Sequence, residues 1–341
     1  MIRVGVIGAG AIGAWHARIV AEGGDTLAAV CDLDRTRAEA ASFGAAVFDD
    51  PEAFFASPLD AVIVATPEAQ HEAHVTAAAR AGLAVLVEKP VAPDMAAMRR
   101  MAEAVRTAGV VAMAAHVERF EAGSAGLKSA LDQGICGQVA AIFARRQFGP
   151  AEAGRFAGTS STLRVLGIHD FDLVRWVHPG PVAAVQAMAA RGAIFEACGL
   201  HDHVVTTLTF EDGAMASVES GWTLPRAYQA YTTPEGWGPA GNNRLEVFGS
   251  DGFVSNDMGL RSQPLVAFDA AEGFRAANLR HQAVIHGRVQ GALRTEVEHF
   301  LDCVRHGREP LVGIDDALRA VALLEAAETA LATARAVTPE L

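Results

Sequence analysis

The chain has 341 residues and a formal net charge of −12 at pH 7. A chain of this length is longer than a domain with a single hydrophobic core usually is, so two domains are predicted. The acidic balance, with no basic run to neutralise a phosphate backbone, argues against nucleic acid as a partner. Hydrophobic residues make up 51% of the chain, yet no apolar run approaches the roughly 20 residues that span a bilayer, so we expect no membrane segment.

From residue 2 to about 115, short apolar runs alternate with helical stretches. The pattern predicts buried strands at Val4–Ile7, Leu27–Cys31, Ala61–Ala65, Leu83–Val87 and Val110–Ala114, and helices at Ile12–Ala21, Arg35–Phe43, Gln70–Ala81 and Asp94–Ala108. Because parallel strands need a crossover long enough to hold a helix, this order predicts a doubly wound parallel sheet. We assign residues 1–120 to an α/β Rossmann domain.

After residue 120 the pattern changes to strands joined by hairpin turns. We expect a helix at Ala125–Gln133, strands at Gln138–Gln147, Val182–Arg191, Val204–Phe210 and Ala214–Ser220, a loop bordering the pocket at Arg226–Asn243, and helices at Thr295–Arg305 and Asp315–Ala334. Residues 121–341 are therefore predicted to form an α+β domain for substrate binding and oligomerisation, with a large, mostly antiparallel open sheet. The last helices are expected to pack within it or back on the Rossmann domain.

The most specific motif is Gly8-Ala9-Gly10-Ala11-Ile12-Gly13, which follows the first strand and opens the first helix. In that context the first glycine permits a tight turn, the second lets the backbone approach a pyrophosphate, and the third lets helix and strand pack closely. The helix N-terminus then offers unpaired N–H groups and a partial positive charge to the diphosphate.

Asp32 ends the second predicted strand, where such folds place the carboxylate that accepts hydrogen bonds from the adenosine ribose. A carboxylate there repels a 2′-phosphate and favours NAD. Arg35 and Arg37 argue the other way, because a guanidinium pairs well with that phosphate, although both are also explained as solvated helix charges. NAD is therefore expected over NADP.

Four motifs together resemble the Gfo/Idh/MocA family of glucose-fructose oxidoreductase-like and inositol dehydrogenase-like enzymes, over nearly the whole chain. They are the glycine loop, Thr66-Pro67 with His71, the triplet Glu88-Lys89-Pro90, and Gly167-Ile168-His169-Asp170-Phe171-Asp172. The stretch His116-Val117-Glu118-Arg119-Phe120 with the histidine motif looks most like the branch of nucleotide-sugar 3-dehydrogenases. The resemblance implies an NAD(P)-dependent dehydrogenase of a sugar, nucleotide sugar or cyclitol, and a homodimer or homotetramer packed through the open sheet face.

The resemblance also implies the roles of individual residues. Lys89 would lie beside the nicotinamide and the substrate hydroxyl, and His169 would accept the hydroxyl proton, for which an imidazole with a pKa of about 6.5 is suited. The residues alone leave open a surface lysine and a core or capping histidine. The implied cofactor site consists of Gly8, Gly10, Ala11, Ile12, Gly13, Asp32, Arg35, Thr66, Pro67, His71, Glu88 and Lys89.

One position departs from the family pattern. Many members carry an aspartate one helical turn before the histidine, and here that position is Val165. Asp170 or Asp172 would then replace it, Lys89 would act alone, or the nicotinamide would serve a reaction other than ordinary alcohol oxidation. His116 and Arg119 are expected at the pocket, with Arg119 either binding a substrate phosphate or tying the two domains together.

The leading hypothesis is reversible hydride transfer between NAD and a secondary alcohol, which needs no metal because the cofactor accepts the electrons. The histidine pairs His71/His74 and His201/His203 are not expected to bind a metal, because no third ligand with suitable spacing is evident. One alternative is a glycosidase-like or lyase-like enzyme that retains NAD and oxidises its substrate transiently. Another is a dinucleotide-binding sensor without activity. The expected location is cytoplasmic, because no leader precedes the first strand and no apolar run is long enough to span a bilayer. The four cysteines show no C-x-x-C spacing, which argues against a structural zinc site or a disulfide framework.

Overall fold

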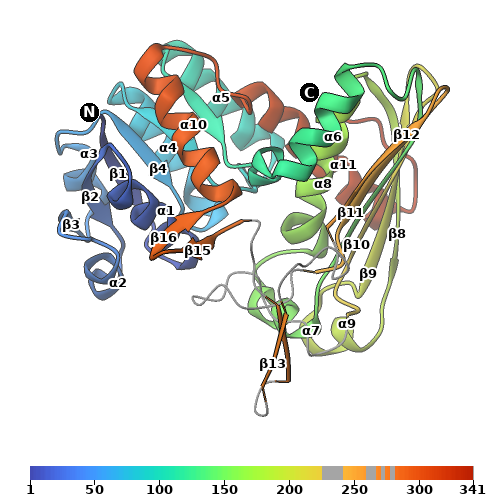
Figure 1. The fold of residues 1–341 in the computed structure, drawn as a ribbon, viewed down its shortest axis with the longest axis horizontal. Helices are drawn as coiled ribbons and strands as arrows, with labels where there is room; N and C mark the ends of the chain where they lie inside the picture. The colour runs from blue at the N-terminus through green and yellow to red at the C-terminus, as the bar shows by residue number, and fades with distance from the viewer. Residues whose placement is uncertain (225–240, 259–265, 270–272, 277–280, 341) are drawn as a thin grey trace. The chain divides into compact units, whose positions relative to one another are not determined.

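The computed structural model describes residues 1–224, 241–258, 266–269, 273–276 and 281–340 (Figure 1). The chain forms two compact units. The first comprises Met1–Phe120 with His281–Val321, and the second comprises Glu121–Arg280 with Ala322–Leu341. Most of the predicted loop Arg226–Asn243 lies outside the described residues.

The first unit contains a parallel sheet with the strand order β3-β2-β1-β4-β5-β6. Its strands are β1 (Arg3–Ile7), β2 (Thr26–Cys31), β3 (Ala46–Phe48), β4 (Ala61–Val64), β5 (Ala84–Val87) and β6 (Ala112–Ala114). All five pairings in this sheet are parallel, which confirms the doubly wound α/β prediction. The strand order reverses between β1 and β4, and in open α/β sheets ligands bind at the carboxyl ends of the strands at such a switch point.

Helices connect these strands, and the chain returns to this unit near its end. The elements are α1 (Ala11–Glu22), α2 (Arg35–Ala40), α3 (Pro51–Phe55), α4 (His71–Arg80), α5 (Met95–Ala108), the hairpin β15 (Ala283–Ile285) and β16 (Arg288–Gln290), and α10 (Ala292–His306). The helix α2 ends before the predicted Phe43, because Phe43 and Gly44 adopt positive φ angles of 46° and 90° and cannot continue a right-handed helix.

Strand β3 and helix α3 were missing from the sequence prediction. Both are short, and hydrophobic periodicity needs a longer window than they provide. A capping signal was nevertheless present: Asp50 precedes Pro51, and its carboxylate accepts hydrogen bonds from the backbone N–H groups of Glu52 at 3.1 Å and Ala53 at 3.2 Å.

The second unit contains a mixed sheet with the strand order β12-β11-β7-β10-β9-β8. Its strands are β7 (Val139–Gln147), β8 (Val182–Ala190), β9 (His203–Phe210), β10 (Met215–Gly221), β11 (Arg244–Gly249) and β12 (Phe253–Asp257). The pairing of β7 with β10 is parallel and the other four pairings are antiparallel, which confirms the predicted, mostly antiparallel sheet.

The helices of the second unit are α6 (Ala122–Asp132), α7 (Pro150–Ala153), α8 (Ile168–Val177) and α9 (Ala193–Cys198), with a separate hairpin of β13 (Val266–Asp269) and β14 (Gly273–Ala276). Helix α11 (Ile314–Thr333) begins in the first unit and ends in the second. Figure 1 shows α6 and α8 along one side of this six-stranded sheet. Among the described helices, none combines the length and hydropathy required to cross a membrane.

A buried ion pair fixes α8 to the sheet. Arg146 on β7 donates from Nε to Asp170 Oδ2 at 3.1 Å and from Nη2 to Oδ1 at 3.0 Å, and both side chains are at most 3% exposed. The two-point geometry compensates part of the cost of burying two charges, and removing one member takes this compensation away from the other. Asp170 is thus held by β7 at the start of the helix that carries His169.

Replacing one member of this pair should therefore cost more stability than replacing both. We expect Asp170→Leu to lower the free energy of unfolding by about 3–5 kcal/mol, because the buried arginine loses the carboxylate that binds it through two hydrogen bonds. The double substitution Arg146→Met with Asp170→Leu should recover most of that loss. Urea unfolding followed by circular dichroism measures both, and a double variant as unstable as the single one would contradict the charge argument.

Candidate active site

The glycine loop after β1 has the geometry that its sequence predicted. Gly8 has a φ of +92°, and its N–H donates to Cys31 O at 2.8 Å. A Cβ atom on Gly13 would lie 1.8 Å from Gly8 O, so only glycine lets α1 approach the loop this closely. A Cβ atom on Gly10 would meet nothing within 4 Å, so this glycine borders open space. That space is available to a ligand backbone such as a diphosphate.

The N-terminus of α1 presents unpaired donors next to this space. Gly10 is its N-cap and provides no side-chain hydrogen bond to the first turn. The N–H groups of Ala11, Ile12 and Gly13 precede the first i→i−4 hydrogen bond, from Ala14 N to Gly10 O at 2.9 Å. Together with the helix dipole, these groups are suited to bind a dianionic diphosphate.

Asp32 lies at the end of β2, where the sequence placed the ribose carboxylate. Its Oδ2 accepts from Ala9 N at 2.7 Å and its Oδ1 accepts from Asp34 N at 2.8 Å. The carboxylate therefore also fixes the second residue of the glycine loop. Arg35 ion-pairs with Glu39 at 3.1 Å and Asp49 at 3.5 Å, so acidic partners surround the guanidinium that would otherwise favour a 2′-phosphate.

Thr66, Pro67 and His71 lie at the carboxyl end of β4, across the switch point. The buried Thr66 Oγ1 has no hydrogen-bond partner among the described residues, and such a group is completed by a ligand or by water. His71 Nε2 lies 2.8 Å from Thr66 O, and its Nδ1 lies 3.1 Å from Pro90 O. Burial lowers the pKa of His71, partly offset by these carbonyl contacts, so the ring ties together the ends of β4 and β5.

The residues of the first unit fit a dinucleotide. An uncapped helix N-terminus, open space at Gly10, a carboxylate at the end of β2 and the unpartnered Thr66 hydroxyl match the diphosphate, the ribose and the remaining polar groups of that ligand.

Glu88 and Lys89 follow β5, and their backbone is held on both sides. Glu88 N donates to Val64 O at 2.9 Å, and Lys89 N donates to Glu88 Oε2 at 3.1 Å. The other carboxylate oxygen, Oε1, lies 2.8 Å from Nε2 of His16 on α1. The sequence prediction did not include His16. A polar residue three positions after Gly13 on the buried face of α1 was the available signal.

Arg119 and His116 follow β6. Arg119 is 3% exposed, and it donates from Nη1 to Leu311 O at 3.1 Å and from Nη2 to Asp316 Oδ1 at 3.3 Å. Leu311 and Asp316 belong to the first unit, so these contacts attach the start of α11 within that unit. His116 is 1% exposed.

In the second unit, His169, Asp170 and Asp172 lie on α8 and are all buried. A π-helical turn, Leu163–Gly167, leads directly into this helix. Val165, at the position of the missing family aspartate, packs against an apolar cluster comprising Phe148, Ala153, Leu166, Leu200 and Trp222. The valine is therefore part of the local core, and the structure leaves Asp170 bound to Arg146.

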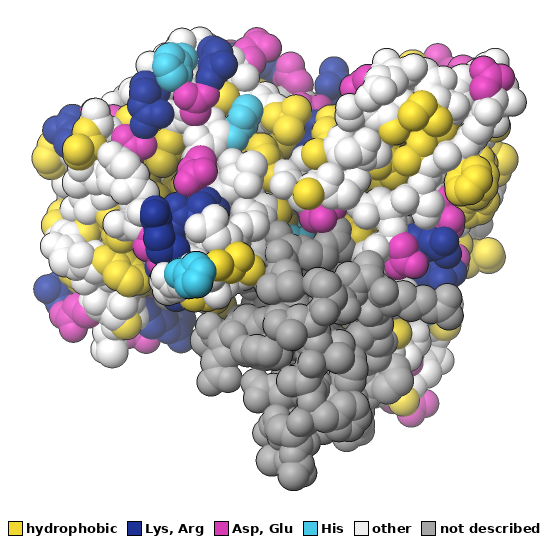
Figure 2. Space-filling view, viewed as in Figure 1, with side chains coloured by type: hydrophobic (Ala, Val, Ile, Leu, Met, Phe, Trp, Pro, Cys, Tyr) yellow, Lys and Arg dark blue, Asp and Glu magenta, His cyan; other side chains and the backbone are white. Residues whose placement is uncertain are grey.

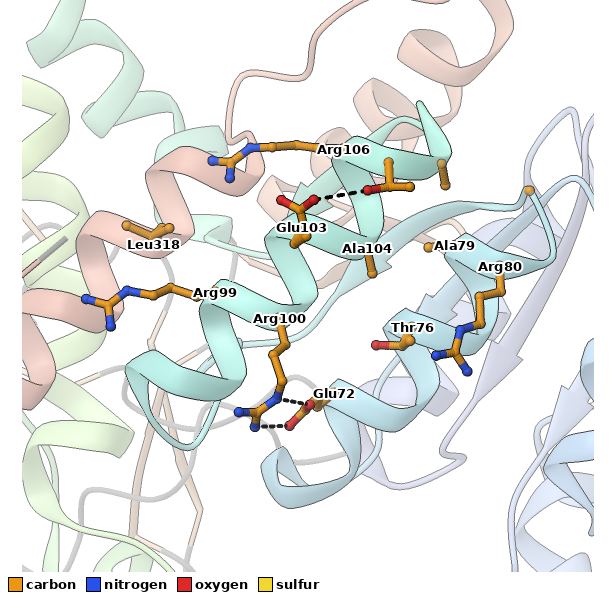
Figure 3. Close-up of a pocket in the computed structure, with 13 residues that line it drawn as sticks. Glu72, Thr76, Ala79, Arg80, Arg99, Arg100, Glu103, Ala104, Arg106 and Leu318 are labelled. Carbon is orange, nitrogen blue, oxygen red and sulfur yellow. Dashed lines mark hydrogen bonds and ion pairs between the residues drawn. The ribbon is translucent and has the colours of Figure 1, made fainter.

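A separate concavity lies between α4 and α5 and is shown in Figure 3. Arginines 80, 99, 100 and 106 line it, and Arg100 is paired with Glu72. It contains none of the residues assigned above to the cofactor or to proton transfer. Among the described residues, no group of three histidines, cysteines or acidic side chains lies close enough to hold a metal ion.

Comparisons with known proteins agree with this geometry. Residues 2–116 match the model of an oxidoreductase family with an NAD-binding Rossmann fold, and residues 125–255 match the GFO/IDH/MocA C-terminal domain. Inositol 2-dehydrogenase 1 from Saccharopolyspora erythraea is 30% identical, with 95% of this chain and 92% of the relative covered. The chain belongs to the Gfo/Idh/MocA family. It is an NAD-dependent oxidoreductase, as the resemblance carried by the sequence motifs had predicted.

Two other matches extend this family assignment. The NAD(+)-dependent scyllo-inositol 2-dehydrogenase of Bacillus subtilis is 27% identical, with 93% of this chain and 90% of the relative covered. A crystal structure of scyllo-inositol dehydrogenase from Lactobacillus casei, with bound NAD(H) and scyllo-inositol, matches with a TM-score of 0.82. It covers 99% of this chain and 98% of its own at 20% identity, so this likeness shows the fold.

The two glycines of the loop should fail for different reasons when a methyl group is added. We expect Gly10→Ala to fold with an unchanged melting temperature but to bind NAD at least tenfold more weakly, because its Cβ would occupy the ligand space. Gly13→Ala should lose stability even without NAD, because its Cβ would overlap Gly8 O. Thermal melts and isothermal titration with NAD measure both. Equal melting temperatures for the two variants would contradict the distinction.

Proposed function

We propose that this family member oxidises a secondary hydroxyl of a cyclitol such as an inositol, with NAD. The observation that carries the proposal is the dinucleotide-shaped loop, together with Lys89 held after β5, in a chain whose relatives named above are inositol dehydrogenases. A nucleotide sugar, which the sequence motifs favoured, would need a phosphate partner. The contacts of Arg119 with Leu311 and Asp316 support an uncharged polyol instead.

The proton chemistry is assigned to Lys89 and His169. When bound, NAD supplies an acceptor for the hydride that leaves the substrate carbon. The hydroxyl proton must leave as well, and an amine or an imidazole with a pKa near the working pH accepts it most effectively. We propose that the Lys89 amine stabilises the developing alkoxide by its charge and that His169 accepts or relays the proton.

Val165 changes how His169 is supported. Because the family aspartate is replaced by a side chain in an apolar cluster, the carboxylate that usually orients the imidazole must come from elsewhere or be dispensed with. Asp170 is engaged by Arg146 through two hydrogen bonds, so we assign this orienting role to Asp172, which lies three residues after His169 on the same helix.

The two alternative functions predict different outcomes of an activity assay. A glycosidase-like or lyase-like enzyme that retains NAD would cleave a bond without accumulating reduced cofactor, and a sensor would bind NAD without turnover. The dehydrogenase names of the relatives support net oxidation. A scan of inositols, other polyols and nucleotide sugars with NAD therefore separates the three by the absorbance of reduced nicotinamide and by product analysis.

We further propose a cytoplasmic location and a homodimer or homotetramer. All four cysteines are free, which is consistent with a reducing compartment. The face of the second sheet opposite α6 and α8 carries exposed Phe143, Met188, Met215, Phe248 and Phe253. Figure 2 shows hydrophobic side chains at the surface where β11 and β12 lie. An uncovered apolar face of this kind supports association between copies.

Lys89 offers the sharpest test of the proposed chemistry. We expect Lys89→Met to lower kcat about 10²- to 10⁴-fold on the best polyol, with NAD binding retained, because the variant removes an amine and little volume. The matched control is Lys128→Met on α6, whose amine pairs with Asp132 and which should keep full activity. Steady-state kinetics measure kcat, and titration measures the affinity for NAD. Full activity in Lys89→Met would refute the assignment.

The oligomer proposal predicts dissociation by charges placed on the open sheet face. Phe248 and Phe253 stack with ring centroids 5.5 Å apart, and they are 37% and 63% exposed. Replacing both by glutamate should convert the oligomer into smaller species, because carboxylates resist burial between copies. Light scattering after size exclusion measures the mass. Phe43→Glu, at an exposed site in the first unit, should leave it unchanged, and a monomeric wild type would overturn the proposal.

A further inference from the structure

A buried hydrogen bond connects the helix of the glycine loop to the residue before Lys89. His16 is 0% exposed and Glu88 is 8% exposed, and Nε2 of the histidine lies 2.8 Å from Oε1 of the carboxylate. His16 lies on α1, the helix whose N-terminus faces the space at Gly10. Glu88 directly follows β5. The bond therefore joins the phosphate-binding element to the segment that bears the lysine amine.

The surroundings specify which group carries the proton. Burial raises the pKa of Glu88, but the His16 hydrogen bond and the charges of His16 and Lys89 more than offset it and lower the pKa overall. The carboxylate is therefore ionised, and His16 Nε2–H donates to it. His16 Nδ1 is buried and has no partner among the described residues.

The other carboxylate oxygen reaches the lysine backbone. Glu88 Oε2 accepts from Lys89 N at 3.1 Å, and from the opposite side His71 on α4 contacts Pro90 O at 3.1 Å and Val91 O at 3.2 Å. The backbone at Lys89 is thus held from two sides: by His16 of α1, which acts through Glu88, and by His71 of α4. Rotation of the Glu88 carboxylate would release the first of these two supports.

We propose that His16 is a positioning residue for the proposed dehydrogenase: by orienting the buried Glu88 carboxylate, it fixes the backbone of Lys89 and keeps a negative charge beside the lysine amine. This inference rests on the proposed function. The charge on Lys89 stabilises the Glu88 carboxylate, so by reciprocity the ionised carboxylate stabilises the ammonium form of Lys89. Loss of His16 should therefore disturb both the position and the proton affinity of the amine.

Three histidines of the first unit come from elements that neighbour β5 or Glu88. His16 comes from α1, His71 from α4, and His116 follows β6, the strand next to β5 in the sheet. Strand β4, on the other side of β5, contributes Ala61–Val64 and no ionisable side chain. Of these histidines, His16 is the one that the structure shows hydrogen-bonded to the carboxylate, whereas His71 contacts backbone carbonyl oxygens. Replacing His16 therefore acts on Glu88 first.

The composition makes Lys89 directly observable. Lys89 and Lys128 are the two lysines of the chain, so a Lys128→Arg background leaves Lys89 as the single lysine. Reductive methylation with ¹³C-formaldehyde then gives one lysine NMR signal, next to that of the N-terminal amine, whose pH titration reports the pKa of Lys89 without any turnover. Activity and NAD affinity are measured on the unmodified proteins.

The experiment compares His16→Leu, which removes the donor, with His16→Gln, which returns an N–H group near the Nε2 position. In His16→Leu we expect the pKa of Lys89 to fall and kcat to drop about tenfold to a hundredfold, with the Kd for NAD nearly unchanged. His16→Gln should recover most of both losses. The control His74→Gln, whose ring on α4 packs against Phe55, should match the parent protein.

Several results would overturn the proposal. An unchanged pKa of Lys89 and unchanged kcat in His16→Leu would do so, as would a kcat loss that follows only a lower melting temperature and is not recovered by glutamine. If His16→Leu does not fold, Glu88→Gln preserves the volume and must still lower the pKa of Lys89. If the parent protein oxidises no polyol, the proposed function fails, whereas the lysine titration still decides whether His16 acts on Lys89.

Discussion

The close approach of α1 to β1 is the constraint on which the first unit depends. A Cβ atom on Gly13 would lie 1.8 Å from Gly8 O, so the helix starts directly behind the turn and its free N–H groups face the space at Gly10. Asp32 holds the turn through Ala9 N. The same helix, one turn further on, presents His16 to Glu88. One packing contact therefore positions both the phosphate site and the support of Lys89.

In the second unit, a buried ion pair and apolar packing fix the position of the helix that carries His169. Helix α8 is fixed by the buried pair of Arg146 and Asp170, and the preceding π-helical turn places Val165 in an apolar cluster. A buried pair of this kind contributes more to a defined geometry than to net stability, because desolvation of both charges opposes their attraction. A defined geometry is what a histidine needs when the usual neighbouring carboxylate is absent.

The sequence predicted the features that depend on local rules. Alternating strand and helix patterns identified the parallel sheet, and the positions of Gly8, Gly10 and Gly13 identified the dinucleotide loop. The short β3 and α3 escaped because they are shorter than the window over which hydrophobic periodicity can be recognised. The partners of His16 and Asp170 escaped for another reason: they lie 72 and 24 residues away, and single-sequence patterns do not report contacts between distant side chains.

The choice of cation at position 89 follows from what each cation can do. Arg3, Arg100, Arg146 and Arg164 all bind carboxylates with two nitrogens, a fixed and permanently charged fork. A guanidinium cannot give up its proton at any working pH, whereas an amine can carry the charge that would stabilise an alkoxide and can also exchange a proton. In a chain with two lysines, the one after β5 is held by Glu88. In the proposed mechanism, the buried Glu88 carboxylate favours the charged amine, and a bound, cationic nicotinamide would oppose it, so cofactor binding and the proton affinity of Lys89 would be linked.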